Sequence, residues 1–333
     1  MKALLSFLAV IVLILIATLG VDAANLHYLF GIIIPYLAFI MFVGGFVYRV
    51  IKWGRSPVPF RIPTTCGQQK SLPWIKQNKI ENPTSALGVI VRMVLEIFFF
   101  RSLFRNSKTE LRVGADGPKL SYGSAKWLWF GSLVFHWSFL IIIVRHLRFF
   151  IEPVPHLLQI VDSIDGMLQI GLPPIYLTDL FFLVGVTFLF LRRVFIPQVR
   201  YISLAADYFP LFMIMGIATS GVLMRYFYRV DIVAVKELAL GLVQLNPAIP
   251  AGIGTIFYVH LFLICSLFAY FPTSKLMHMG GIFLSPTRNM MNNNRMVRHI
   301  NPWNPELEYH TYAHYEDEYR EKMKKAGIPV EKE

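Results

Sequence analysis

Four histidines of this chain lie where imidazole groups are rare, in or at the ends of long apolar segments. His136 and His146 are ten residues apart in one segment, and His260 and His278 are eighteen apart in and just past another. An imidazole in hydrocarbon needs a partner, so such residues mark a hydrogen bond between helices, a proton path or a bound metal. The chemistry therefore depends on whether the two segments bring their histidines together.

Helical geometry gives each segment two histidines on one side. At about 100° and 1.5 Å per residue, His136 and His146 lie within about 80° and about 15 Å of one another. On a straight helix His260 and His278 share a face and lie about 27 Å apart. We expect helix tilt, Pro272 and the place of His278 at or past the helix end to absorb the difference between the two spacings.

Antiparallel packing of the two segments would pair His146 with His260 and His136 with His278. A porphyrin between two imidazoles satisfies both, as axial ligands of one iron. The pattern therefore predicts two stacked haems of the b type, since the chain has no C-x-x-C-H motif for covalent attachment. Hydrogen bonding between helices, a zinc site and a proton relay stay open. Zinc is the weaker rival because no Cys or carboxylate accompanies either pair, and a relay needs acids, of which the spans hold almost none besides Asp179.

The composition is that of an integral membrane protein. Of the 333 residues, 55% are hydrophobic and 16% charged, against about 25% charged in an average soluble chain; the mean hydropathy is +0.53. A spanning helix needs about 20 apolar residues. We predict an all-α integral membrane fold of about six such helices, near 3–20, 27–50, 127–150, 176–194, 208–228 and 253–272.

The distribution of charge predicts the orientation. Residues 51–126 hold thirteen Lys and Arg against four acids, whereas 151–175 hold Glu152, Asp162 and Asp165 and no Lys or Arg. Lys and Arg gather on the cytoplasmic side of membrane proteins, so we expect both termini in the cytoplasm and the chain in the cytoplasmic (inner) membrane. This bias also accounts for the net charge of +12 without a nucleic-acid partner.

The chain divides into three expected parts. Residues 1–26 form an N-terminal transmembrane helix, which also fits a signal peptide but which we expect to be kept. Residues 27–278 form the histidine-bearing bundle, and residues 279–333 a cytoplasmic tail that docks a partner. The tail contains His299, His310 and His314, which we expect at the surface.

Two loops of the bundle are expected to carry helices of their own. In the cytoplasmic loop 51–126, residues 83–105 predict a helix lying on the membrane surface rather than a seventh span, which would reverse every later segment. The outer loop 154–170 predicts a short amphipathic helix. Two cysteines, Cys66 and Cys265, are too few for an iron–sulfur cluster held by this chain alone or for a disulfide framework.

The histidine spacing resembles that of a known family. Pairs spaced 10 and 18 on the second and fifth helices of a five-helix core, here 27–278, are similar to the di-haem cytochrome b subunit of respiratory nitrate reductases (NarI-like). The stretch FRIPTTCGQQKSLPWIKQNKIENPTS (60–85), together with VRHLRFF (144–150), resembles the DsrM family, the membrane cytochrome b subunits of DsrMKJOP complexes in sulfate- and sulfite-reducing microbes. The likeness covers nearly the whole chain, which departs from the nitrate reductase subunit in an extra first helix and the long basic loop.

The resemblance implies electron exchange between menaquinone or menaquinol and a cytoplasmic iron–sulfur subunit of the DsrK kind, among the other DsrMKJOP subunits, in dissimilatory sulfur metabolism. His146 and His260 would ligate the outer haem, and His136 and His278 the inner one. Two rival functions stay open: a haem-free membrane anchor for a soluble redox partner, and a proton channel or transporter.

Several charged residues near the histidines have expected roles. Arg145 and Arg148 flank His146 and could pair with haem propionates or with lipid headgroups, and Lys275 could meet an inner propionate. Three outer acids could relay a proton from a quinol, although simple solvation explains the two in the loop equally well: Asp179 in the fourth span, and Asp162 and Asp165.

Overall fold

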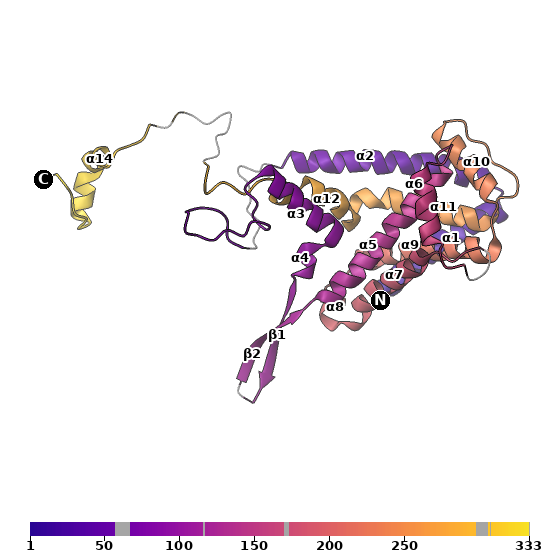
Figure 1. Ribbon diagram of the computed structural model, residues 1–333, viewed down its shortest axis with the longest axis horizontal. Coiled ribbons are helices and arrows are strands. Elements are labelled where there is room, and N and C mark those ends of the chain that lie inside the picture. The colour runs from indigo at the N-terminus through magenta and orange to yellow at the C-terminus, as the bar shows by residue number, and fades with distance from the viewer. Residues whose placement is uncertain (57–66, 116, 170–172, 298–305, 307, 333) are drawn as a thin grey trace.

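The computed structural model describes residues 1–56, 67–115, 117–169, 173–297, 306 and 308–332, which are mostly helical (Figure 1). The long helices run in alternating directions, in the order α1 (Lys2–Asp22), α2 (Ile34–Gly54), α5 (Lys126–His146), α7 (Leu177–Phe195), α9 (Ala205–Val222) and α11 (Thr255–Tyr270). The shorter helices are α3 (Ala86–Phe99), α4 (Arg101–Phe104), α6 (His156–Asp165), α8 (Pro197–Ile202), α10 (Ile232–Val243), α12 (His278–Leu284), α13 (Pro286–Asn289) and α14 (Tyr312–Lys325).

Five helical stretches of the described chain are long and apolar enough to cross a membrane: Lys2–Asp22, Leu29–Gly54, Lys126–Phe149, Ala205–Tyr228 and Thr255–Thr273. They confirm the prediction of a multi-pass, helical membrane protein. The fourth predicted span, α7, carries Asp179, Arg192 and Arg193 in its end turns, and these charges set it apart from the other five. It nevertheless packs against α5 and α9 in the bundle.

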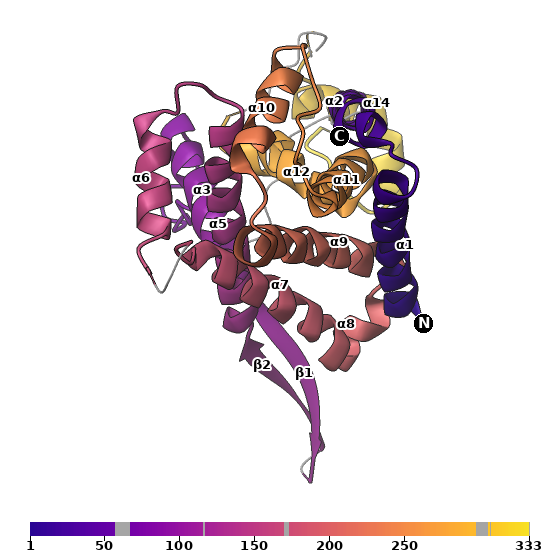
Figure 2. The ribbon, with the colours of Figure 1, turned by 90° about the vertical axis from the view of Figure 1, so that its right-hand side faces the viewer.

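The bundle is built by successive packing of neighbouring helices. Figure 2 shows α9 between α7 and α11, and α5 and α2 pack on the far sides of α7 and α11 respectively. Met213, Val186 and Leu263 are fully buried at its centre. The α5–α7 contact is close because Gly185 has no side chain: a Cβ atom there would lie 3.0 Å from the Cα atom of Phe135.

The first helix belongs to the same core. α1 packs against α9 and α11, and it buries Val10, Ala17 and Val21. At one end the Lys2 Nζ atom donates a hydrogen bond to the Ser203 carbonyl oxygen at 3.0 Å. If residues 1–26 are kept as a transmembrane helix, we expect this helix to be packed into the bundle in this way.

α3 has an inverted burial pattern. Its polar residues Arg92 and Glu96 are buried, whereas Leu87, Ile90, Val94 and other apolar residues are exposed. Arg92 donates to the Thr287 carbonyl oxygen at 3.1 Å, and Glu96 lies 3.1 Å from Arg288. A helix that turns its polar face to the protein and its apolar face outward suits the membrane surface, as the surface helix predicted over 83–105 requires. That helix is not continuous, because Phe100 takes a left-handed conformation (φ 50°, ψ 45°) and separates α3 from α4.

A β-hairpin in the same loop was not predicted. Strands β1 (Ser107–Gly114) and β2 (Gly117–Ser124) pair antiparallel, with Leu111 opposite Leu120, and project from the helices (Figure 1). Alternating residues on both sides of Gly117, which has a φ of +88°, were the available signal. The all-helical prediction therefore needs this small correction.

The tail has two parts. Residues up to 297 pack on the α3 region, where the Asn292 side chain donates to Asn82 Oδ1 at 2.8 Å; α14 follows beyond residues that lie outside the described chain.

Elsewhere, α6 confirms the short helix predicted in the loop 154–170, and Cys265 is a buried free thiol. Cys66 and His299 lie outside the described residues.

The close approach of α5 and α7 can be tested at Gly185. Replacing Gly185 by Val should destabilise the bundle by about 1–3 kcal/mol, because the new side chain meets backbone rather than a movable side chain. The measurement is the midpoint temperature for loss of monodisperse protein in detergent. Gly44→Val is the matched control, since nothing lies within 4 Å of a Cβ at that position; equal midpoints for the two variants would contradict the packing.

Candidate haem-ligating histidine pairs

The inner pair, His136 and His278, is brought together by α5 and the first residue of α12. Their ring centroids are 6.1 Å apart, and the ring planes meet at 82°. His136 Nδ1 donates to the Ser132 carbonyl oxygen and His278 Nδ1 to that of Lys275, both at 2.8 Å. Each Nδ1 is thereby occupied, which leaves Nε2 as the atom available to a metal.

The helical conformation is interrupted between His260 and His278, and this interruption determines where His278 lies. α11 ends at Tyr270, a 3-10 turn containing Pro272 follows, and Ser274 is extended (φ −104°, ψ 176°) before a second 3-10 turn leads to His278. His278 therefore lies past the end of α11, and Pro272 lies in the turn between them, as expected from the sequence. Since the path is not a continuous helix, the 27 Å separation that disagreed with the 15 Å of the other pair does not apply.

The outer pair consists of His146, the last residue of α5, and His260 on α11. His146 Nδ1 donates to the Ile142 carbonyl oxygen at 2.7 Å. His260 Nδ1 lies 2.8 Å from the Ser220 hydroxyl, which itself contacts the Gly216 carbonyl oxygen at 2.8 Å. Because the hydroxyl has one proton to give, the consistent arrangement is Nδ1–H to Ser220 and Ser220 to the backbone.

The donor set fits bis-histidine haem ligation. A metal–imidazole bond is about 2 Å long, so the centres of two opposed rings on one metal lie roughly 6 Å apart, close to the inner pair's separation. His146 and His278 are exposed and His136 is half-buried although they end or lie in apolar segments, so the protein by itself does not enclose these rings. Among the described residues, neither pair has a third His, Cys, Asp or Glu at metal-ligand distance, which argues against zinc.

Arg145, for which a haem propionate or a lipid headgroup was the expected partner, is held by protein carboxylates. It is buried, with its Nη2 atom 2.7 Å from Asp179 and its Nε atom 2.9 Å from Asp165. Asp165 also accepts two hydrogen bonds from Thr178, one from the backbone and one from the hydroxyl. Asp165 is therefore a buried structural acid, and simple solvation is the wrong interpretation for it.

An aromatic ring joins this ion-pair network to a second arginine. The guanidinium groups of Arg145 and Arg225 lie 3.6 and 3.7 Å from the Tyr176 ring centroid, a separation at which cation–π attraction is strong. The Tyr226 hydroxyl donates to Asp179 at 3.1 Å. Sequence reasoning missed all three of Tyr176, Arg225 and Tyr226, because about 50 residues separate Tyr176 from the other two.

Arg148 and Lys275 also have protein partners. Arg148 lies 2.9 Å from Asp162, which accepts a 2.6 Å hydrogen bond from the Tyr176 hydroxyl. Lys275 lies 2.6 Å from the buried Asp207 at the opposite end of the bundle. The Lys275 side chain is nevertheless 71% exposed.

The α3–α4 corner reaches the inner pair. The Phe100 ring packs edge-on against His136, with 5.0 Å between centroids. The indole N–H groups of Trp129 and Trp137 donate to the Phe99 and Phe98 carbonyl oxygens at 2.7 and 3.0 Å. These bonds fix the end of α3, and a bulky residue in a left-handed conformation persists only where its surroundings hold it.

The amino-acid sequence is similar to those of known proteins. Residues 87–299 match the family described as the nitrate reductase gamma subunit, a region that contains all four histidines and α5, α7, α9 and α11. The chain is 43% identical over 284 residues to an Hdr-like menaquinol oxidoreductase cytochrome b-like subunit of Archaeoglobus fulgidus, covering 83% of this chain and 84% of that protein. It is 40% identical over 282 residues to the protein of the same description in Archaeoglobus profundus, covering 83% and 82%.

The buried ion-pair network predicts unequal roles for two neighbouring arginines. Arg145→Ala should cost about 3–5 kcal/mol of stability, because it leaves Asp165 and Asp179 without their buried counter-charge. Arg148→Ala, the control, removes a more exposed pair and should cost less than about 1 kcal/mol. Chemical denaturation in detergent measures both, and an Arg145 variant as stable as the Arg148 variant would show that the network does not hold the outer end together.

Proposed function

Because the chain belongs to the nitrate reductase gamma subunit family, we propose that it is the membrane cytochrome b subunit of an Hdr-like menaquinol oxidoreductase. The observation that carries the proposal is the His136–His278 pair, with both Nδ1 atoms anchored and the rings 6.1 Å apart. Within that class we assign it to the DsrM kind, with a DsrK-like iron–sulfur subunit and the other DsrMKJOP subunits as partners in dissimilatory sulfur metabolism.

His136 and His278 would hold one b haem, and His146 and His260 a second. Two bound haems would supply one-electron transfer between a two-electron menaquinol and the cytoplasmic iron–sulfur partner. The protein would orient the four imidazoles through the hydrogen bonds at their Nδ1 atoms. It belongs in the cytoplasmic membrane with both termini in the cytoplasm, which the positive charge of the loop 51–126 supports.

The acids at the outer end would lie on the path of protons released by a quinol oxidised near His146. Asp179 accepts a hydrogen bond from the Tyr226 hydroxyl and pairs with Arg145, whose neighbour in the chain is His146. Asp162 is more exposed, with 34% of its side chain accessible, and offers protons a way to the outer water.

The pairing of ligands gives the main test. We expect about two b haems per chain in a pyridine haemochrome assay, with His136→Ala and His278→Ala each removing the same haem and His146→Ala and His260→Ala each removing the other. Redox titration of the remaining haem identifies which one is lost. A haem-free wild-type protein would contradict the proposal and leave a membrane anchor, and loss of one shared haem from the His136 and His260 variants would contradict the pairing.

The hydrogen bond between Ser220 and His260 predicts that replacing Ser220 shifts the midpoint potential of one of the two haems. An acceptor at Nδ1–H raises the basicity of the ligand and favours ferric iron, so Ser220→Ala should raise the midpoint potential of the His146/His260 haem alone. A hydrogen bond worth about 1 kcal/mol corresponds to roughly 40 mV for one electron. Ser138→Ala is the control, because the Ser138 hydroxyl bonds only its own helix at Val134 and Phe135; equal potentials in both variants would contradict the assignment.

A further inference from the structure

A cluster of possible metal ligands lies in the tail, away from the four bundle histidines. His310, His314 and Glu318 each offer one ligand atom, and these atoms all lie within 4.8 Å of one another. Within the described chain they are the one group of three or more such residues that meets this distance. The spacing of four residues puts His314 and Glu318 on the same side of α14, and His310 lies just before that helix.

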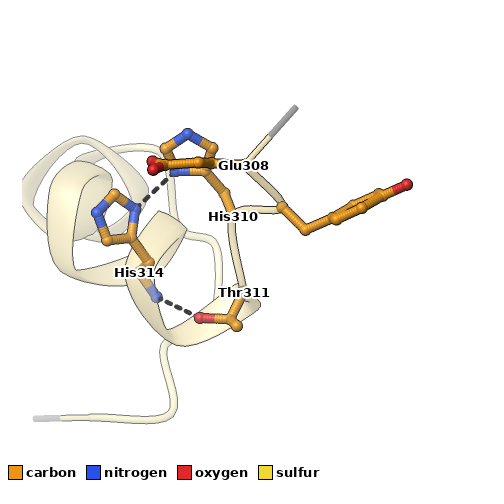
Figure 3. Close-up of a pocket in the computed structure, with 5 residues that line it drawn as sticks. Glu308, His310, Thr311 and His314 are labelled. Carbon is orange, nitrogen blue, oxygen red and sulfur yellow. Dashed lines mark hydrogen bonds between the residues drawn. The ribbon is translucent and has the colours of Figure 1, made fainter. Parts of the chain in front are cut away.

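The two imidazoles already point at one another. Figure 3 shows the rings of His310 and His314 facing across a shallow hollow, and their Nδ1 atoms are 2.8 Å apart. Two nitrogens bound to one tetrahedral metal at about 2.1 Å would lie roughly 3.4 Å apart, so the rings need to separate by only a few tenths of an ångström. Glu308 lines the same hollow and brings a second carboxylate beside His310 (Figure 3).

The helix that carries the ligands is held at both ends. Thr311 caps its N-terminus by accepting from the His314 backbone N–H at 3.3 Å. At the C-terminus Gly327 is left-handed, and the Ile328 backbone N–H donates to the Met323 carbonyl oxygen at 2.9 Å. The buried Glu316 accepts from the backbone N–H groups of Glu331 and Lys332, which ties the last residues to the helix. His314 and Glu318 therefore sit on a preformed helix, which lowers the ordering cost of binding.

We propose that His310, His314 and Glu318 bind a divalent transition metal of the zinc class. Two imidazoles and a carboxylate are ligands that Zn²⁺ accepts. Glu318 is exposed and offers the third ligand atom from the turn of the helix that follows His314. Because His310 precedes the first residue of α14, the metal would fasten the incoming chain to the first two turns of the helix.

Equilibrium dialysis of the purified full-length protein, free of any histidine tag, against Zn²⁺ tests the site. Bound zinc is measured by elemental analysis, which separates it from haem iron. We expect about one zinc per wild-type chain, and His310→Ala and His314→Ala should each lower the affinity at least about tenfold. Glu318→Gln should weaken binding, while the controls Glu321→Gln, on the same helix, and His156→Ala, an exposed histidine elsewhere, should not.

The haem content of each variant is measured alongside, so loss of the proposed function and loss of this site can be told apart. Equal zinc binding by the wild type and a His310→Ala/His314→Ala double variant would overturn the proposal. So would binding that the His156 variant lowers as much as the His314 variant.

Discussion

The hydrogen bond that each bundle histidine makes through Nδ1 is the constraint on which the rest of the structure depends. An imidazole N–H in an apolar environment must have an acceptor, and three of the four find it in a carbonyl three or four residues earlier in the chain. A backbone carbonyl has two lone pairs, so it can serve its helical partner and the ring together. The ring is then fixed with Nε2 directed away from its own helix. His260 reaches the same result through Ser220 of α9, which explains why α9 must lie beside α11.

Much of this arrangement could be predicted from the sequence, because apolar length and histidine spacing are local properties. The spans, the surface helix and the meeting of His136 with His278 follow from them. The place of His278 past the helix end was expected as well, but the extended Ser274 and the second 3-10 turn that carry the chain to it were not. The partners of Arg145 could not be found either: Asp165 and Asp179 approach it only after two loops have folded, and no local pattern reports such a contact.

Several charged side chains are buried and many apolar ones are exposed, the reverse of a water-soluble protein. A lipid environment around the helices explains this distribution. Arg92, Glu96, Arg145 and Asp207 are all buried, whereas large apolar side chains cover the outside of the helices. Each of these buried charges has a partner from another segment, so the polar contacts join elements that apolar packing alone would leave free to slide. The ion pairs gather at the two ends of the bundle and leave its middle to close-packed residues such as Met213 and Leu263.

The edge-on contact of Phe100 with His136 places the α3–α4 corner directly beside an inner histidine. Phe100 is only half-buried, and its neighbours Phe98 and Phe99 are exposed. Phe100 therefore covers the His136 ring on the side of the α3–α4 corner. If His136 ligates a haem as proposed, an electron carrier bound at this corner would lie close to that haem, and the rate of electron tunnelling falls steeply with distance.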